Sequence, residues 1–395
     1  MLFSKAGSRA LGACAAAALA AGVVFAATGS ADSPPGVGLS DVPSANERAV
    51  GYAPASRLSA GLVQIAWAQG SSKLENPQGI VSFYGYENDT PAVDNPVLAQ
   101  MVPTPANPTE AQKTEPDKNT YLTFKDGLVG PDATYPYGTH FLYQGHEGAA
   151  KDANNNKLGY ITRINLDADA EHRVTLMATQ DTSGKPLATI DGSTWDPFAK
   201  RLVFTTESLS APTYAATADY PSQVEDVSGA LGRGGYEGVQ NDSDGNLWIV
   251  EDIGGPGKAG TTAKQPNSFV YRYVPRSPGD LHNGKLQALQ VLNKAGEPIT
   301  FESQGALNAP DRLADHSYGN QLDTQWVVVH DTTTDGSTPF NANAAAKAKQ
   351  ATPFKRPENG QFRPGSKFGE FYFDETGDTN STSPENPYPG GGWGA

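Results

Sequence analysis

The chain has 395 residues, a formal net charge of −14 and one cysteine, Cys14. The acidic balance argues against nucleic acid and anionic membrane surfaces as partners. Its 43 glycines and 30 prolines exceed ordinary usage but fall short of a disordered composition, so we expect turn-rich structure in one large domain or two smaller ones.

Residues 1–31 have the pattern of a secretory signal peptide. Lys5 and Arg9 precede an uncharged, alanine-rich run over residues 10–27, and small residues follow at the cleavage positions. The run is too weakly hydrophobic to favour a spanning helix, and Cys14 lies too early in it for a lipoprotein cysteine. We therefore expect an exported monomer, periplasmic or extracellular, that has no membrane attachment after cleavage.

Cleavage would leave a mature chain without cysteine. Disulfides, thiolate metal ligands and a cysteine nucleophile are then excluded together. Loss of the two positive charges of Lys5 and Arg9 takes the formal charge from −14 to −16. Such a surplus of carboxylates is compatible with Ca²⁺ sites.

Residues 32–115 form a loop-rich segment. Asn76-Pro77 and the stretch from Pro103 to Lys118 have loop composition, and only Gly79–Tyr86 has the pattern of a strand. This segment is either an insertion in the following domain or an arm that completes it.

Residues 116–395 repeat one pattern, in which an aromatic or β-branched run ends in acidic residues and a turn follows. The runs are Thr139–Glu147, Arg201–Glu207, Asn246–Asp252, Gln325–Asp331 and Phe371–Glu375. Asp242–Asn246 has the composition of a tight turn that leads into the third run. The only helical pattern is a short one over residues 342–349.

Recurring antiparallel strands with acidic ends predict an all-β fold, and we expect a β-propeller of about five to seven blades. In a propeller, equivalent strand ends point to one axis. The ends expected to converge are Glu147, Glu207, Glu251, Asp331 and Asp374. A β-sandwich is the alternative, and it would scatter these ends over separate edges.

Arg356-Pro357-Glu358 precedes the last aromatic strand. The residue before a proline favours extended backbone, so Arg356 and Glu358 should point the same way. A guanidinium can fork onto phosphate oxygens while the carboxylate holds a cation that shares them. The alternative is an ion pair on a surface turn.

Several short segments, taken in order, resemble the PhoX-type alkaline phosphatases. They are Gly145–Glu147, Thr194–Glu207, Gly232–Val239, Trp248–Asp252, Tyr271–Pro275 and Arg356–Glu358 with the Phe-Tyr-Phe strand after it. The resemblance implies a propeller whose axial pocket holds iron and calcium and hydrolyses phosphate monoesters. It also implies that Glu207, Glu237 and Glu358 bind metal and that Arg356 binds phosphate, which makes Arg356 and Glu358 the expected catalytic residues.

Three positions depart from the family pattern. Thr206 stands in place of the family cysteine, Tyr236 in place of a histidine and Asn359 in place of an acid. A ferric pair bridged by cysteine cannot form on a threonine hydroxyl, so Ca²⁺ in an all-oxygen site is expected rather than Fe³⁺. Glu251 and Asp252 are either a solvated turn or further Ca²⁺ ligands.

Three functions are compatible with these residues. In an exported phosphatase acting on a small phosphorylated substrate, cations would clamp the phosphoryl oxygens and activate water. A calcium-dependent propeller lactonase or esterase would not need Arg356. A non-catalytic calcium-binding propeller would keep the pocket as a structural or ligand site. Among the histidines, His146 beside Glu147 is the best candidate for the pocket, although a strand histidine is more often structural.

Overall fold

The computed structural model describes residues 62–86, 113–256, 264–300 and 310–377, except positions 64, 71, 153 and 155. The expected signal peptide and much of the loop-rich segment lie outside these residues. The chain separates into two compact units, one of residues 1–4, 67–91 and 111–395 and one of residues 5–66 and 92–110. Every element described below belongs to the first unit.

The described part of the chain is mostly β-structure, and its main sheets are antiparallel and open. The first sheet contains β1 (Pro116–Thr123), β2 (His140–His146), β5 (Ile161–Asn165) and β6 (Val174–Ala178), with a small hairpin of β3 (Ala150–Lys151) and β4 (Lys157–Leu158) inserted. The second contains β7 (Ser193–Asp196), β8 (Arg201–Phe204), β9 (Tyr214–Ala216) and β10 (Val224–Asp226). The third contains β11 (Tyr236–Asn241), β12 (Leu247–Glu251), β13 (Val270–Pro275), β14 (Gly284–Val291) and β15 (Thr324–Asp331). The last pairs β16 (Pro357–Phe362) with β17 (Phe371–Glu375).

Four short helices accompany these sheets in the described part: α1 (Ser228–Leu231), α2 (Pro310–Asp315), α3 (Thr332–Asp335) and α4 (Ala342–Ala348). Helix α4 confirms the helical pattern expected over residues 342–349. Its N-cap is Asn341, whose side chain accepts a hydrogen bond from the Ala344 amide. No helix among the described residues is long and apolar enough to cross a membrane.

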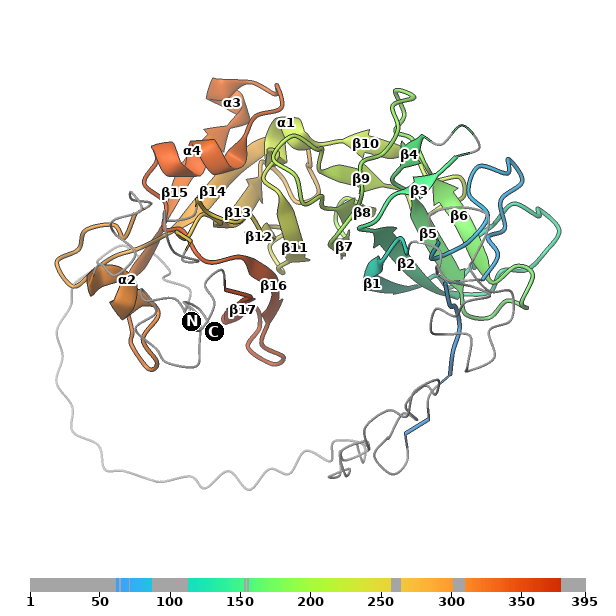
Figure 1. Ribbon diagram of the computed structural model, residues 1–395, viewed down its shortest axis with the longest axis horizontal. Helices are drawn as coiled ribbons and strands as arrows, with labels where there is room; N and C mark the ends of the chain where they lie inside the picture. The colour runs from blue at the N-terminus through green and yellow to red at the C-terminus, as the bar shows by residue number, and fades with distance from the viewer. Residues whose placement is uncertain are drawn as a thin grey trace, which may run out of the picture. The chain divides into compact units, whose positions relative to one another are not determined.

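Strands that follow one another in the chain are neighbours in every main sheet, and Figure 1 shows the colour changing from sheet to sheet accordingly. The first strand of each sheet contacts the first strand of the next: β7 contacts β1 and β11, and β11 contacts β16. The antiparallel strands predicted from the sequence are thus confirmed. In the described residues they form several stacked sheets rather than the two sheets of a sandwich.

The core consists of apolar layers between successive sheets. Leu202 and Phe204 of β8 pack toward the first sheet, whereas Val203 between them packs toward the third. Both faces of β8 are therefore buried, as expected for a strand with an uninterrupted apolar run. Between the third and last sheets, the Trp248 ring lies 5.3 Å from that of Phe362 and 5.0 Å from that of Phe371.

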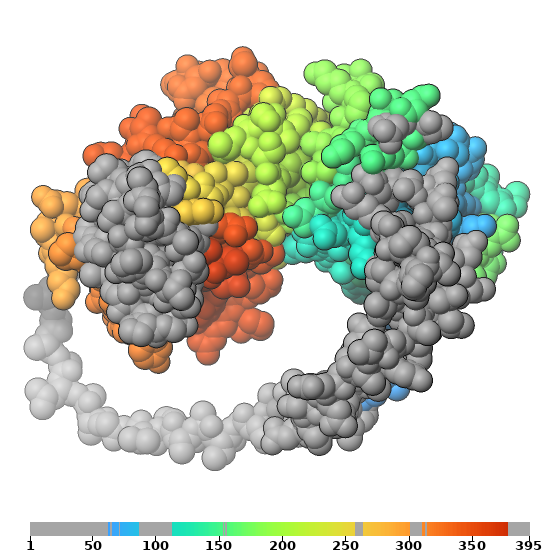
Figure 2. All heavy atoms as spheres, viewed as in Figure 1, coloured from blue at the N-terminus to red at the C-terminus, as the bar shows by residue number. Residues whose placement is uncertain are grey.

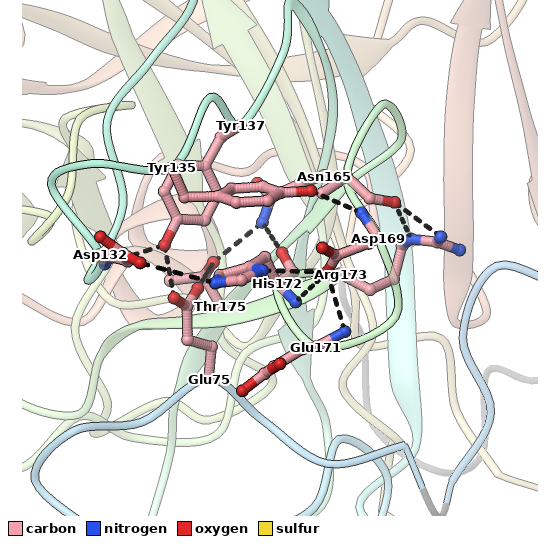
Figure 3. A network of polar contacts seen from close by, with 11 residues as sticks. Glu75, Asp132, Tyr135, Tyr137, Asn165, Asp169, Glu171, His172, Arg173 and Thr175 are labelled. Carbon is pink, nitrogen blue, oxygen red and sulfur yellow. Dashed lines mark hydrogen bonds and ion pairs between the residues drawn. The ribbon is translucent and has the colours of Figure 1, made fainter.

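The segment before β1 is attached to the outer strand of the first sheet. Glu75 forms a parallel bridge with Thr175 of β6, and its carboxylate accepts hydrogen bonds from the hydroxyls of Tyr137 and Thr175. Figure 3 shows these contacts beside His172, which stacks on Tyr135 with ring centroids 3.7 Å apart. The loop-rich segment therefore contributes an extended piece to the first sheet, centred on Glu75 rather than on Gly79–Tyr86.

Candidate metal centre

Seven carboxylates occupy corresponding places on the successive sheets. Four lie at the start of a first strand: Asp117 on β1, Asp191 just before β7, Glu237 on β11 and Glu358 on β16. Three follow the end of a second strand: Glu147 after β2, Glu207 after β8 and Asp252 after β12. The first and second strands of a sheet are antiparallel, so the start of the first strand lies beside the end of the second.

Six of the seven carboxylates form three overlapping groups, within each of which the potential ligand oxygens lie within 4.8 Å of one another. The groups are Asp117–Asp191–Glu237, Glu147–Asp191–Glu207 and Glu207–Glu237–Asp252. Asp191, Glu207 and Glu237 each belong to two groups. The arrangement is thus one continuous acidic cluster that draws on the first three sheets.

Asp191 is the most confined carboxylate of this cluster. It is 3% exposed, and the side chains in hydrogen-bonding contact with its carboxylate are themselves the acids Asp117 and Glu237. Burial and the adjacent carboxylates of Asp117 and Glu237 raise its pKa far above the usual range. A buried carboxylate next to two other carboxylates is unfavourable unless a proton or a cation lies between them.

The pKa values of the neighbouring glutamates, Glu207 and Glu237, are also raised. Burial, followed by the charges of Asp252 and Glu147, raises the pKa of Glu207 to about 7. Burial also raises the pKa of Glu237, and the Glu358 carboxylate contributes to the increase. Perturbed carboxylates that cluster in this way are typical of functional sites.

Arg356 is already bound to a member of the cluster. Its Nε donates to Asp252 Oδ1 at 2.6 Å and its Nη2 donates to Asp252 Oδ2 at 2.8 Å. Arg356 has φ +53°, so the extended backbone expected before Pro357 is wrong. The left-handed conformation costs about 1–3 kcal/mol, and hydrogen bonds from Thr376 to the Arg356 carbonyl hold it.

Glu358 faces the same cluster without belonging to the three ligand groups. Its charge raises the pKa values of Glu147, Glu207 and Glu237. One of its carboxylate oxygens accepts a hydrogen bond from Thr376. Arg356 and Glu358 therefore lie beside the same cluster, although the backbone of Arg356 differs from the extended conformation expected.

Lys118 is a basic group within the acidic surroundings. Its Nζ donates to the Val239 carbonyl at 3.2 Å. Burial lowers its pKa to about 8, although Asp117, Glu237 and Asp191 favour the charged form. The ammonium thus partly balances the group formed by Asp117, Asp191 and Glu237.

Glu251 does not join the cluster. It is fully buried, and its Oε2 accepts hydrogen bonds from the Phe269 amide, the Tyr271 hydroxyl and the Asn343 amide. Successive side chains of a strand point to opposite faces. The Glu251 side chain therefore points into the core, whereas the Asp252 side chain points to the cluster. The end of β12 therefore reaches the cluster through Asp252, and Glu251 belongs to none of the three ligand groups.

Asp331 and Asp374 also lie outside the ligand groups. Asp331 ends the outer strand β15, forms an ion pair with Lys285 at 3.2 Å and caps α3, so its predicted convergence is wrong. Asp374 lines a cavity next to Asp117.

His146 is fully buried, its ring is stacked on that of Tyr160 with centroids 3.8 Å apart, and burial lowers its pKa to about 3. This supports the structural interpretation of His146.

The sequence interpretation missed Asp117 and Asp191 as candidate ligands. Neither ends an aromatic run, because both precede or begin a first strand. A usable signal was Gly192 directly after Asp191: a Cβ added there would lie 1.9 Å from the Glu237 carbonyl oxygen. Such a glycine indicates close backbone approach.

No protein-family model matches this chain, and no curated protein matches it. The resemblance to PhoX-type phosphatases therefore stays a prediction that rests on the segments quoted above.

Proposed function

We propose that the acidic cluster binds Ca²⁺ and that the protein is a metal-dependent hydrolase of phosphate esters. The supporting observation is Asp191, a 3% exposed carboxylate whose neighbours in the cluster are the carboxylates of Asp117 and Glu237. A divalent cation relieves both the burial of charge and the repulsion between these groups, which water at this position cannot do. Arg356, just before β16, lies beside the cluster through its hydrogen bonds to Asp252.

The donor set favours Ca²⁺ over iron. All candidate ligands in the cluster are carboxylate oxygens, which Ca²⁺ accepts in flexible geometry and in numbers of six to eight with water. Thr206, at the family's cysteine position, donates its hydroxyl hydrogen bond to the Pro212 carbonyl at 2.9 Å. A neutral hydroxyl with a carbonyl partner is a poor substitute for a bridging thiolate.

The chemistry follows from the overlap of the ligand groups. Adjacent groups share Asp191, Glu207 and Glu237, so two bound cations would be neighbours. Such cations clamp phosphoryl oxygens and lower the pKa of a bound water. The Arg356 guanidinium, oriented by Asp252, would donate to the oxygens on which charge develops.

One observation favours a second candidate, a non-catalytic calcium-binding protein. The Nε and Nη2 atoms of Arg356 already donate hydrogen bonds to the Asp252 carboxylate. Binding phosphate would require the guanidinium to use its remaining donors or to exchange partners. A structural calcium site has no such requirement.

The fold that suits either function is a β-propeller. Each sheet begins with the strand that contacts the preceding and following sheets, and the candidate ligands lie at the ends of these strands. In a propeller the first strand of each blade lines the axis. This order supports a radial arrangement of the sheets, which we propose for an exported protein of the PhoX-like kind.

The test is metal content combined with turnover. Protein prepared without chelator should contain calcium by elemental analysis, and the calcium-loaded protein should hydrolyse p-nitrophenyl phosphate or its bis ester. Chelator should abolish the activity and added Ca²⁺ should restore it. Calcium without turnover of either ester at any pH would select the non-catalytic alternative, and protein without calcium would contradict both.

A further inference from the structure

We propose that the cavity beside the metal centre binds the organic part of the phosphate ester, and that this part is a neutral, hydroxyl-rich group such as a sugar or polyol. The cavity has a volume of about 590 Å³. It is lined by Asp117, Lys118, Gln240, Asn359–Gln361 and Tyr372–Asp374. The inference rests on the proposed function, which places the phosphate on the cations.

The cavity and the metal centre share one residue. Asp117 belongs both to the cavity wall and to the group Asp117–Asp191–Glu237. Asn359, another residue of the cavity wall, directly follows Glu358 and packs on Gly238, where an added Cβ would lie 3.1 Å from the Asn359 Cα. A phosphate held at this group therefore has the cavity next to its ester oxygen.

One polar face of the β16–β17 hairpin contributes to the wall. Gln361 and Tyr372 are direct cross-strand partners, and Asp374 is two residues further along the same face. These three residues are exposed, whereas Phe362 and Phe371 on the other face are buried in the core. In Figure 2 the hairpin, coloured red, forms part of the molecular surface.

The chemistry of this wall suits hydroxyl groups. The side chains of Gln240 and Gln361 each offer donors and an acceptor, which a hydroxyl needs in combination. Tyr372 adds an aromatic surface for the apolar face of a ring. Its hydroxyl donates to Glu370 at 3.0 Å, which holds the ring in place.

The charges of the wall argue against a highly anionic group. Asp117 and Asp374 contribute carboxylates, and Lys118 is the only basic side chain among the described residues that line the cavity. Because a bound cation would neutralise Asp117, the repulsion of a second or third phosphate would come from the Asp374 carboxylate. Nucleoside diphosphates and triphosphates should therefore be poorer ligands than a sugar monophosphate.

The experiment compares glucose 6-phosphate, ADP and inorganic phosphate on the calcium-loaded full chain. Calorimetry should show glucose 6-phosphate binding more tightly than inorganic phosphate, with ADP weaker than glucose 6-phosphate. Gln361→Ala and Tyr372→Ala should each weaken glucose 6-phosphate binding by about three- to tenfold. Inorganic phosphate, which does not reach the cavity, should bind these variants as it binds the parent. Tyr121→Ala, which removes an exposed ring of β1 outside this wall, is the matched control and should change neither affinity.

Because binding is measured without turnover, failure of the hydrolase proposal is distinguishable from failure of this one. Binding that depends on Gln361 and Tyr372, in a protein that cleaves nothing, supports the cavity and contradicts the hydrolase. Equal affinity for glucose 6-phosphate and inorganic phosphate overturns the cavity proposal. So does an absence of binding, or an affinity difference that both variants leave unchanged.

Discussion

Glu251 and Asp252 are consecutive residues whose carboxylates have opposite surroundings. Asp252 lies in the acidic cluster and holds Arg356, whereas Glu251 is buried in the core, where its Oε2 accepts three hydrogen bonds. We predict that Asp252→Asn lowers the calcium content, because it removes a charged ligand. Glu251→Gln should leave the calcium content unchanged, since the amide oxygen still accepts the three hydrogen bonds. Elemental analysis of both variants checks this, and equal calcium loss in both would contradict it.

Arg356 and Glu358 should have separable effects. Arg356→Ala should lower kcat for p-nitrophenyl phosphate by about a hundredfold, because one oriented donor to the transition state is lost. Its calcium content should persist, since a guanidinium binds no cation and its loss leaves Asp252 to the metal. Glu358→Ala should lose both calcium and activity. Parallel assays of turnover and metal content decide the matter, and calcium loss in the arginine variant would contradict the separation.

Individual residues of the site were predictable where they belong to a motif and not elsewhere. Glu207, Glu237 and Asp252 were identified as candidate ligands, and the structure brings them together. Asp191 was missed, because its importance comes from contacts with Asp117 and Glu237, which are distant in the chain. The choice between Glu251 and Asp252 depends on which face of β12 meets the next sheet, and no local pattern determines that face.

At the level of elements, β11 and β16 are held together by close backbone approach. A Cβ added at Gly238 would lie 3.1 Å from the Glu358 carbonyl oxygen and 2.7 Å from Asn359 Oδ1. We predict that Gly238→Ala destabilises the protein by about 1–3 kcal/mol through overpacking and weakens calcium binding, because it displaces Glu358.

The matched control for this substitution is Gly184→Ala. Gly184 has φ +80° and no atom within 4 Å of an added Cβ, so it carries only the conformational cost of about 1 kcal/mol. Chemical denaturation and calcium titration of both variants test the prediction. Unchanged calcium affinity in Gly238→Ala would show that this contact does not position the site.

The loop before β6 provides a pH-dependent element. The hydrogen bond to Asp169 raises the pKa of His172 above its ordinary value of 6.5. Protonated His172 therefore favours the folded state at pH below the unfolded pKa, and this contribution is lost as the pH rises through the raised folded pKa. The melting temperatures of the parent and of His172→Gln should differ more at pH 5.5 than at pH 9. An imidazole NMR titration with a midpoint below 6.5 would contradict this.

For the whole molecule, bound calcium should contribute to stability. A ligand that binds only the folded state at a hundredfold excess over its Kd adds about 2.7 kcal/mol. We predict that chelator lowers the melting temperature by roughly 5 °C. Thermal unfolding with and without chelator, followed by calcium re-addition, is the measurement. The same melting temperature in all three conditions would exclude a stabilising cation.

The fold was predictable to the level of antiparallel strands. The aromatic and β-branched runs at Thr139–Glu147, Asn246–Asp252 and Gln325–Asp331 correspond to β2, β12 and β15. Their positions within the sheets were not predictable from local pattern. Asp331 ends an outer strand and Asp252 follows a strand next to the first one, although both runs have the same appearance in the sequence. The run of apolar residues indicates that a strand is buried, whereas the position of the strand in its sheet depends on which strands it pairs with.

The order of strands in the sheets also has a kinetic consequence. Each main sheet is built from strands that follow one another in the chain, so it can form from local contacts, which are fast to make. The carboxylates of the three ligand groups, in contrast, extend from Asp117 to Asp252 and come from three different sheets. During synthesis from the N-terminus, the first sheet can therefore form before the last of these carboxylates, Asp252, has been made. Calcium should then act on the association of the sheets and leave the formation of each sheet unaltered.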